Sequence, residues 1–314
     1  MEQASRPPET VDTASIAAAV RRLGRNAGGY FGEVIHIEAV MQEQRQWAEA
    51  HGWHVESISV APGLSLPAFG RTVPQPQRRI YLSTGIHGDE PAGPLAVREL
   101  LKENAWPTDA DLWLCPCLNP TGFPRNTRES ADRLDLNRDY RSLRSPEIRA
   151  HVAWLDQQPR FDLTLCLHED WEAHGFYVYE VNADNAPSLA PKMIEAVRSF
   201  CPIDPSTLID EREAKNGIIR PVLDPLLRLE WAEAFYLYVN KTRLSYTLKR
   251  PRIFRCPCAW PRWWRRRRRR CTPANFRRAE RAERDTASAS PPVPPARASV
   301  CHPARRRRAT SAPR

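Results

Sequence analysis

Apolar positions in the first 248 residues follow two periods, one typical of strands and one typical of helices. Short, nearly continuous apolar runs, as in buried strands, occur at residues 78–84, 111–118, 161–168 and 175–182. Apolar residues at helical spacing occur at residues 15–30, 40–53, 91–103, 145–158 and 188–200, and an alternating stretch at residues 55–62 predicts one more strand. Because short strands alternate with helices, the pattern predicts an α/β sheet with helices on both faces.

Polar residues gather where three of these strands end. His87 and Glu90 follow the first strand on a tight turn, a long polar loop at residues 121–140 follows the second, and His168 ends the third. Ligands of open α/β sheets bind beyond the carboxyl ends of the strands. Two imidazole nitrogens and a carboxylate with an open fourth position suit hydrolytic zinc. The His-x-x-Glu spacing alone also occurs in solvated turns, but the third candidate ligand at another strand end favours one Zn²⁺ on His87, Glu90 and His168.

The loop at residues 121–140 contains a second candidate group. Arg128, Asn137 and Arg138 have side chains that suit an anionic partner, because a guanidinium binds a carboxylate through two parallel hydrogen bonds. The same residues are also consistent with a solvated loop held by ion pairs that cap helices. From the residues alone the solvated loop is the favoured interpretation.

Four segments in order carry a more specific signal: GIHGDEPAG, LNPTGF, NTRESADRLDLNRDY and LCLHED. Together they resemble the zinc carboxypeptidase family of the carboxypeptidase A type, and the related succinylglutamate desuccinylase and aspartoacylase group shares the first and third of them. The resemblance covers roughly residues 75–248. It implies a mixed central β-sheet of eight strands between helices, and zinc ligands at the positions already named. It also implies that Arg128 polarises the scissile carbonyl and stabilises its oxyanion, while Asn137 and Arg138 hold the terminal carboxylate of the substrate.

The activity implied by this resemblance is zinc-dependent hydrolysis of an amide bond next to a free carboxylate. The substrate would be a peptide or, in the alternative of an N-acyl amino acid deacylase, an N-acyl amino acid. Family members close a late strand of the type aromatic–Thr–apolar–Glu with the glutamate that serves as general base. In this chain the corresponding residues are Tyr246-Thr247-Leu248, and Lys249 follows. A lysine there removes the base and adds a positive charge near the metal, so we expect weak or no turnover.

Charge divides the chain at the same position. Of the 47 Lys and Arg residues, 21 lie from Lys249 onward with 3 acidic residues, a net of +18, whereas the first 248 residues carry 26 basic and 34 acidic residues, a net of −8. The sequence therefore predicts a catalytic domain over residues 1–248, whose residues 1–60 form an N-terminal helical part, and an Arg/Pro-rich disordered tail over residues 249–314. The expected glutamate is missing at residue 249. From the same residue onward, the sequence also lacks the apolar spacing typical of helices and strands.

A change of reading frame explains both observations at once. The segment Lys-Arg-Pro-Arg-Ile-Phe-Arg can be encoded so that one added base in front yields Glu-Thr-Pro-Ser-Asp-Phe-Pro, which restores the glutamate. In the competing interpretation the tail is genuine and binds nucleic acid, through phosphate neutralisation by its arginines and base stacking on its tryptophans. A frame-shifted tail would still bind polyanions non-specifically. The alternative to a hydrolase is thus a non-catalytic zinc protein whose basic tail binds nucleic acid.

The cysteines and the N-terminal residues give little further evidence about function. Cys115, Cys117 and Cys166 lie in apolar strand-like runs, where small buried core residues are expected rather than a metal or redox site. The first 15 residues lack the pattern of a signal peptide and no apolar run has the length of a membrane span, which favours a cytoplasmic location. The oligomeric state is not indicated by any pattern.

Overall fold

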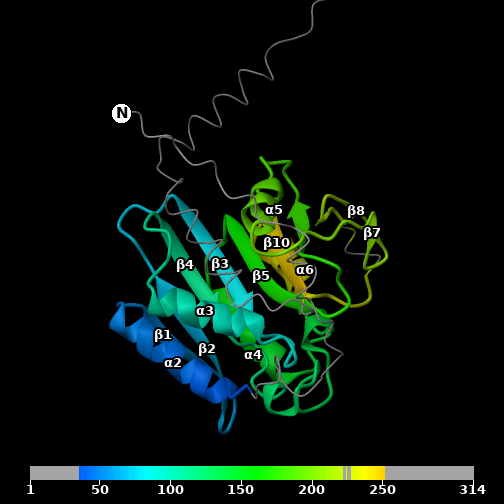
Figure 1. Ribbon diagram of the computed structural model, residues 1–314. Coiled ribbons are helices and arrows are strands. Elements are labelled where there is room, and N and C mark those ends of the chain that lie inside the picture. The colour runs from blue at the N-terminus through cyan, green and yellow to red at the C-terminus, as the bar shows by residue number, and fades with distance from the viewer. Residues whose placement is uncertain (1–34, 222–223, 225–227, 252–314) are drawn as a thin grey trace, which may run out of the picture. The chain divides into compact units, whose positions relative to one another are not determined.

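The computed structural model describes residues 35–221, 224 and 228–251 (Figure 1). Within them a single ten-stranded sheet has the order β1-β2-β4-β3-β5-β10-β6-β9-β8-β7. Its strands are β1 (His54–Ala61), β2 (Leu64–Arg71), β3 (Arg78–Thr84), β4 (Ala110–Cys115), β5 (Leu163–Asp170), β6 (Tyr177–Asn182), β7 (Leu208–Ile209), β8 (Arg212–Lys215), β9 (Ile218–Ile219) and β10 (Leu244–Pro251). The central strands β4, β3, β5 and β10 are parallel, and antiparallel pairs join β1 to β2, β2 to β4 and β10 to β6. The mixed sheet that the sequence predicts is confirmed.

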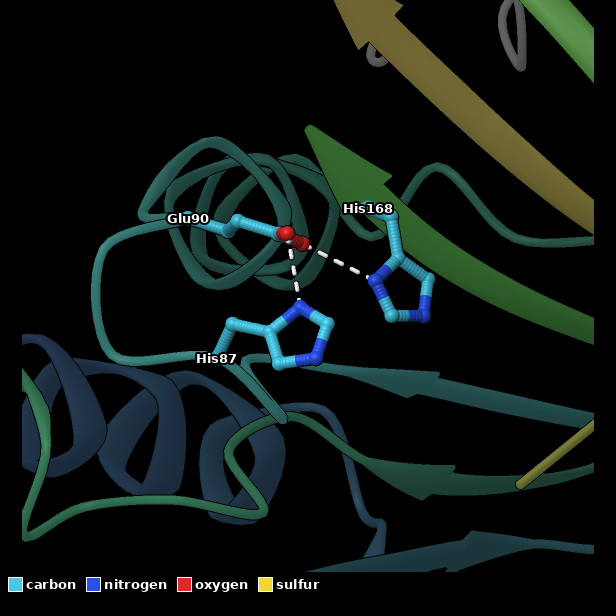
Figure 2. Close-up of side chains that lie close together, drawn as sticks. All are labelled: His87, Glu90 and His168. Carbon is cyan, nitrogen blue, oxygen red and sulfur yellow. Dashed lines mark hydrogen bonds and ion pairs between the residues drawn. The ribbon is translucent and has the colours of Figure 1, made fainter. Parts of the chain in front are cut away.

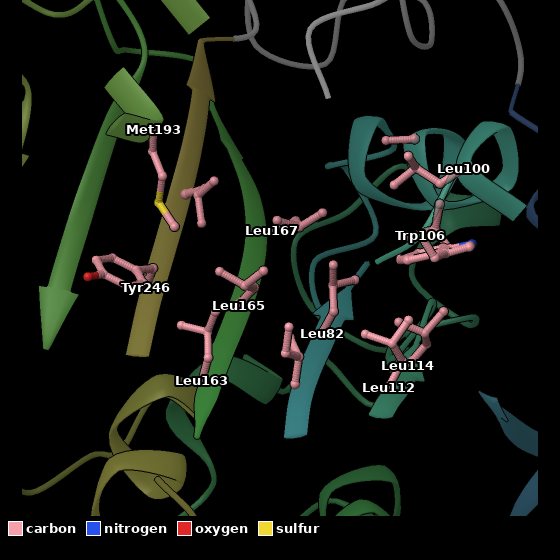
Figure 3. Close-up of a cluster of buried hydrophobic side chains, with 14 of the residues drawn as sticks. Leu82, Leu100, Trp106, Leu112, Leu114, Leu163, Leu165, Leu167, Met193 and Tyr246 are labelled. Atoms are coloured by element: carbon pink, nitrogen blue, oxygen red, sulfur yellow. The ribbon is translucent and has the colours of Figure 1, made fainter. Parts of the chain in front are cut away.

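The helices are α2 (Ile37–Ala50), α3 (Ala92–Lys102), α4 (Pro146–Gln157), α5 (Ala190–Arg198) and α6 (Glu233–Asn240), with short 3₁₀ turns at Phe123–Arg125 and Leu136–Arg138. One apolar cluster joins α2, α3 and α5 to one face of the sheet; the residues labelled in Figure 3 include Leu82, Leu165 and Tyr246. A second cluster joins α4 and α6 to the opposite face. Helices therefore cover both faces, as the sequence predicts.

Local sequence explains where these helices begin. Ser145 precedes α4, and its Oγ accepts a hydrogen bond of 3.4 Å from the backbone N–H of Ile148, while Pro146 occupies the first helical position. Pro91 likewise stands directly before α3. The predicted helix at residues 15–30 lies outside the described residues.

Two expectations differ from the structure. The sheet has ten strands instead of eight, because the chain after α5 adds the short strands β7, β8 and β9 beyond β6. Strand β10 also continues through Pro251, three residues past the boundary expected at Leu248. Lys249, Arg250 and Pro251 pair with His168, Glu169 and Asp170 of β5, so the start of the predicted tail is part of the sheet. Among the described residues, no helix is both long enough and apolar enough to cross a membrane.

Candidate metal centre

Three side chains converge at the carboxyl ends of β3 and β5 (Figure 2). His87 lies in the turn after β3, Glu90 lies just before α3, and His168 lies near the end of β5. The Nδ1 atom of His87 is 2.6 Å from Glu90 Oε1, and the Nδ1 atom of His168 is 2.9 Å from Glu90 Oε2. All three side chains are buried. The structure thus brings together the three metal ligands that the sequence predicts.

The turn that carries His87 and Glu90 depends on glycine. Gly85 has φ of +62°, a left-handed conformation that side chains disfavour. At Gly88 an added Cβ would lie 2.2 Å from the backbone of Gly122, so only glycine permits the turn to approach the loop after β4 this closely. These two positions bring the His-x-x-Glu segment back over the end of the sheet.

The donor set fits a zinc ion. One donor atom from each of His87, Glu90 and His168 lies within 4.8 Å of the other two, a separation from which all three can reach one cation. Two histidines and a glutamate are a ligand set of catalytic zinc sites. A cation would also offset the charge of a carboxylate that is 8% exposed.

Electrostatics leave Glu90 and His168 in the ionisation states that metal binding needs. Burial raises the pKa of Glu90, but His87, His168 and Lys249 outweigh it and hold that pKa well below its ordinary value. Burial, and after it the charge of Lys249, lowers the pKa of His168 to about 3. Burial also acts to lower the pKa of His87, yet the carboxylates of Glu90 and Asp135 raise it overall. An ionised Glu90 and a neutral His168 can both donate an electron pair to a cation at neutral pH.

Asp135 connects the cluster to the loop after β4, and the sequence analysis missed it. Its Oδ1 lies 3.5 Å from Nε2 of His87 and accepts a 2.9 Å hydrogen bond from the backbone N–H of Asn137. Its Oδ2 accepts a 2.9 Å hydrogen bond from Nε of Arg128. A carboxylate on the outer nitrogen of a ligating histidine orients the ring, as is common in zinc sites.

The three predicted substrate-binding residues are not equally close to the cluster. Arg128 lies against it, with NH1 3.2 Å from His87 Nδ1 and 3.7 Å from Glu90 Oε1. Asn137 is buried, and its Oδ1 accepts a hydrogen bond from the backbone N–H of Glu233 at the start of α6. Arg138 is half exposed; its guanidinium donates to the carbonyl of Asn137 and lies 3.9 Å from Glu230. Of these three residues, only Arg128 therefore contacts the metal-ligand side chains directly. Asn137 is linked to Arg128 through Asp135, which accepts hydrogen bonds from both, and Arg138 is linked to Asn137.

Comparisons with known proteins concern the fold and the family that the chain resembles. The family model of the succinylglutamate desuccinylase/aspartoacylase catalytic domain matches residues 76–200. Carboxypeptidase SOL1 of Arabidopsis thaliana is 35% identical over 108 residues, which are 26% of this chain and 21% of that protein, so the chain spans about a fifth of that relative's length. A protein of Shewanella baltica OS155 assigned as a metallopeptidase has a TM-score of 0.62 at 20% identity, over 74% of this chain and 90% of that one. A metallo-carboxypeptidase of Pseudomonas aeruginosa, solved with (2-guanidinoethylmercapto)succinic acid, has a TM-score of 0.52 at 19% identity, over 73% of this chain and 65% of that one. The chain has the metallocarboxypeptidase fold.

On this metallocarboxypeptidase fold, Lys249 stands beside the cluster in β10. It pairs in register with His168 on β5 and with Tyr177 on β6. Its neighbour Leu248 belongs to the apolar cluster under α3 and α5, so Lys249 projects from the opposite face, together with His168. The residue expected to replace the family's glutamate thus lies next to a predicted metal ligand.

The next residue, Arg250, forms a buried ion pair that the sequence analysis also missed. Its NH1 lies 2.7 Å from Oε1 of Glu169, and the two side chains are 2% and 1% exposed. The other oxygen of Glu169 accepts a hydrogen bond from the backbone N–H of Ala92 at the start of α3, and the backbone N–H of Glu169 donates to Glu90 Oε2. Arg250 therefore neutralises the carboxylate that links β5 to the turn bearing Glu90.

A buried polar network lies under the cluster, on the side of α4 and α6. Glu233 accepts hydrogen bonds of 2.8 Å from the hydroxyl groups of Tyr81 and Ser83. His151 lies between the hydroxyl groups of Tyr81 and Tyr140, at 3.0 and 2.7 Å, and burial lowers its pKa to about 3. Burial raises the pKa of Glu233 to about 7, against the opposing effect of Ser83 and Tyr81. The only sequence signal for Glu233 is one carboxylate at the start of an otherwise apolar helix.

The raised pKa of Glu233 has a testable effect on stability. Between about pH 4.5 and 7 the unfolded chain loses the Glu233 proton while the folded chain keeps it, so the free energy of unfolding falls as pH rises through this window. The fall due to this group is on the order of 3 kcal/mol. We expect Glu233→Gln to remove it, as measured by urea denaturation at pH 5 and 7. An unchanged pH slope in the variant would contradict the assignment.

Proposed function

We propose that the protein is a zinc-dependent hydrolase that cleaves an amide bond next to a free carboxylate. The observation that carries this proposal is the convergence of His87, Glu90 and His168 beside Arg128 at the carboxyl ends of β3 and β5. The metallocarboxypeptidase fold and the Arabidopsis relative support it. A peptide with a free C-terminus is the proposed substrate class.

Each residue has a distinct proposed task. His87, Glu90 and His168 hold the zinc ion, which when bound supplies Lewis-acid polarisation of a carbonyl. Arg128 donates hydrogen bonds to the oxyanion, where a preorganised cation contributes most because its position is already fixed, here by Asp135. The amide of Asn137 and the guanidinium of Arg138 bind the substrate carboxylate.

Turnover by this chain is proposed to be weak. The residue beside His168 in β10 is Lys249, whose ammonium group has no electron pair with which to accept a proton. Binding of metal and of substrate does not require the missing base. The proposal is therefore of a protein that retains the binding functions of the site and has lost most of its catalytic power.

A second candidate activity, N-acyl amino acid deacylation, is favoured by the family model over residues 76–200. Both activities use the same metal ligands and need a group that binds a carboxylate, so the two differ in what lies on the acyl side of the scissile amide. The alternative of a nucleic-acid-binding tail concerns residues 249–314, of which residues 252–314 lie outside the described residues.

Zinc analysis of the purified full chain tests the metal site. We expect about one zinc ion per chain, and an affinity at least about 100-fold lower in His168→Gln, because even changes to residues behind the ligands cost 10- to 100-fold. His54→Gln is the matched control, since this exposed histidine lies on β1 and pairs only with Glu56 in the described part of the chain. Equal zinc affinity in the wild type and in His168→Gln would overturn the site.

A substrate panel decides between the two activities. Short peptides, N-succinyl amino acids and N-acetyl amino acids are compared, each with a free and an amidated carboxylate. Hydrolysis of peptides alone supports the carboxypeptidase activity, and hydrolysis of the acyl amino acids alone supports deacylation. Equal rates on the free and the amidated carboxylates would contradict the proposed role of Asn137 and Arg138.

A further inference from the structure

A cavity of about 320 Å³ lies against the outer strands of the sheet, on the face that α4 covers. Small-molecule sites have volumes of roughly 300–1,000 Å³, so this cavity suits a small ligand. It is separate from the metal centre, because none of the metal ligands and none of the predicted substrate-binding residues lines it. The lining residues that decide its chemistry are His54 and Glu56 of β1, Gly70 of β2, Trp113 of β4 and Trp154 of α4.

Gly70 leaves the floor of the cavity open. It pairs in register with His54 on β1 and with Trp113 on β4, so these three residues lie side by side on one face of the sheet. Among the described residues other than its chain neighbours, a Cβ at residue 70 would meet only the Cβ of His54 within 4 Å, at 3.9 Å. A glycine inside a strand often marks a place where a ligand approaches the backbone closely. The backbone of β2 is therefore open to the cavity between an imidazole and an indole ring.

Glu56 gives one wall of the cavity a negative charge. Its Oε2 accepts a 2.7 Å hydrogen bond from Nε1 of Trp154, and its Oε1 lies 2.8 Å from Nε2 of His54. The indole N–H is a neutral donor, and so is an unprotonated imidazole, so these contacts fix the carboxylate without cancelling its charge. The Glu56 side chain is 41% exposed, and a carboxylate can accept about four hydrogen bonds. It can therefore bind a further donor from the cavity.

Arg71, the arginine of the lining, does not offset this charge. Along β2 it alternates with Gly70, so its side chain projects from the opposite face of the sheet. There its guanidinium lies 5.3 Å from the ring centroid of Trp53. The cavity thus combines the carboxylate of Glu56 with the half-buried ring of Trp113. A carboxylate next to a tryptophan face favours an organic cation over an anion, because the face of the ring also attracts positive charge.

We propose that this cavity binds a small aromatic amine. The ammonium group of the ligand pairs with Glu56, and its ring lies over Gly70 against Trp113, where no side chain covers the sheet. The inference is independent of the proposed function, since it involves neither the metal ligands nor the residues that would bind the substrate.

Titration of the full-length protein with phenethylamine, followed by ligand-observed NMR, tests the cavity. At about pH 8, where an ordinary histidine is neutral, we expect Glu56→Gln to bind the amine about 10-fold more weakly. Glutamine keeps an oxygen that can accept from Trp154, so this variant removes the charge and little else. Gly70→Val fills the floor and should abolish detectable binding. Glu195→Gln is the matched variant, because Glu195 is an exposed carboxylate on α5 outside the cavity.

The matched ligand is 2-phenylethanol, which has the same ring and no charge. Weaker binding of phenethylamine in Glu56→Gln and in Gly70→Val, but not in Glu195→Gln, supports the site. Equal affinity in the wild type and in Gly70→Val, or no binding to the wild type, overturns it. Equal affinity of the wild type for 2-phenylethanol and phenethylamine overturns the assignment to a cation. Circular dichroism melting identifies any variant that is not folded, and the other variant then decides.

Discussion

Replacement of Lys249 by glutamate is expected to raise kcat of the zinc-loaded protein by about 10² to 10⁴-fold, the usual contribution of a positioned general base. The backbone needed for this gain is already present. Residue 249 pairs with His168 on β5, and β10 continues in register for two more residues to Pro251. A carboxylate at residue 249 would therefore project from the same face as His168, without any change downstream.

The measurement is the release of free amino acid from the best substrate of the panel, at equal zinc occupancy in every variant. Lys249→Gln is the control, because it removes the positive charge and supplies no base; it should stay near the wild-type rate. A chain with the restored reading frame is the second comparison. If Lys249→Glu remained at the level of Lys249→Gln while the restored chain was active, the segment after residue 249 would be required as well.

The metal ligands could be predicted from the sequence because their signal is local. His87 and Glu90 share one turn, and His168 ends an apolar strand whose direction follows from the α/β pattern. Asp135 was within reach of the same reasoning, since it stands two residues before Asn137, but its role depends on contact with a histidine 48 residues away. The sequence of a loop does not indicate which distant residues its side chains contact in the folded protein.

Other features depend on pairing between distant segments. The ion pair of Arg250 and Glu169 joins residues 81 apart and exists because β10 lies beside β5 in one particular register. The short strands β7, β8 and β9 were not predicted, since two to four residues carry no period. Strand β2 has eight residues, but it contains a proline and a glycine that weaken the signal of a strand, and it was not predicted either. Glu233 could not be assigned because its partners Tyr81 and Ser83 lie on a strand about 150 residues earlier.

The buried ion pair also bears on the change of reading frame. Arg250 is the second residue after the position where the frame is predicted to change, yet it neutralises a buried carboxylate. A restored frame would place threonine there, which cannot neutralise Glu169. The frame change stays a prediction, and sequencing of the gene tests it. What the structure adds is that residues 249–251 have partners in the sheet as they stand.

Loss of Arg250 is expected to be the most destabilising single change in the described part of β10. Arg250→Met leaves Glu169 as a buried carboxylate without its countercharge, and breaking such a pair by removing one partner typically costs about 3–5 kcal/mol. The measurement is the free energy of unfolding by urea denaturation. Arg243→Met is the control: Arg243 also pairs with a carboxylate, that of Asp184, but both groups are more than half exposed, so no measurable change is expected.

The double variant Glu169→Gln with Arg250→Met decides whether charge is the cause. If the cost of Arg250→Met comes from the unpaired carboxylate, removing that charge should recover most of it, so that the double variant is more stable than Arg250→Met alone. The single variant should also bind zinc more weakly, because the carboxylate of Glu169 accepts a hydrogen bond from the start of α3 and the backbone N–H of Glu169 donates to Glu90. A double variant no more stable than Arg250→Met would instead assign the loss to the packing of the long arginine side chain.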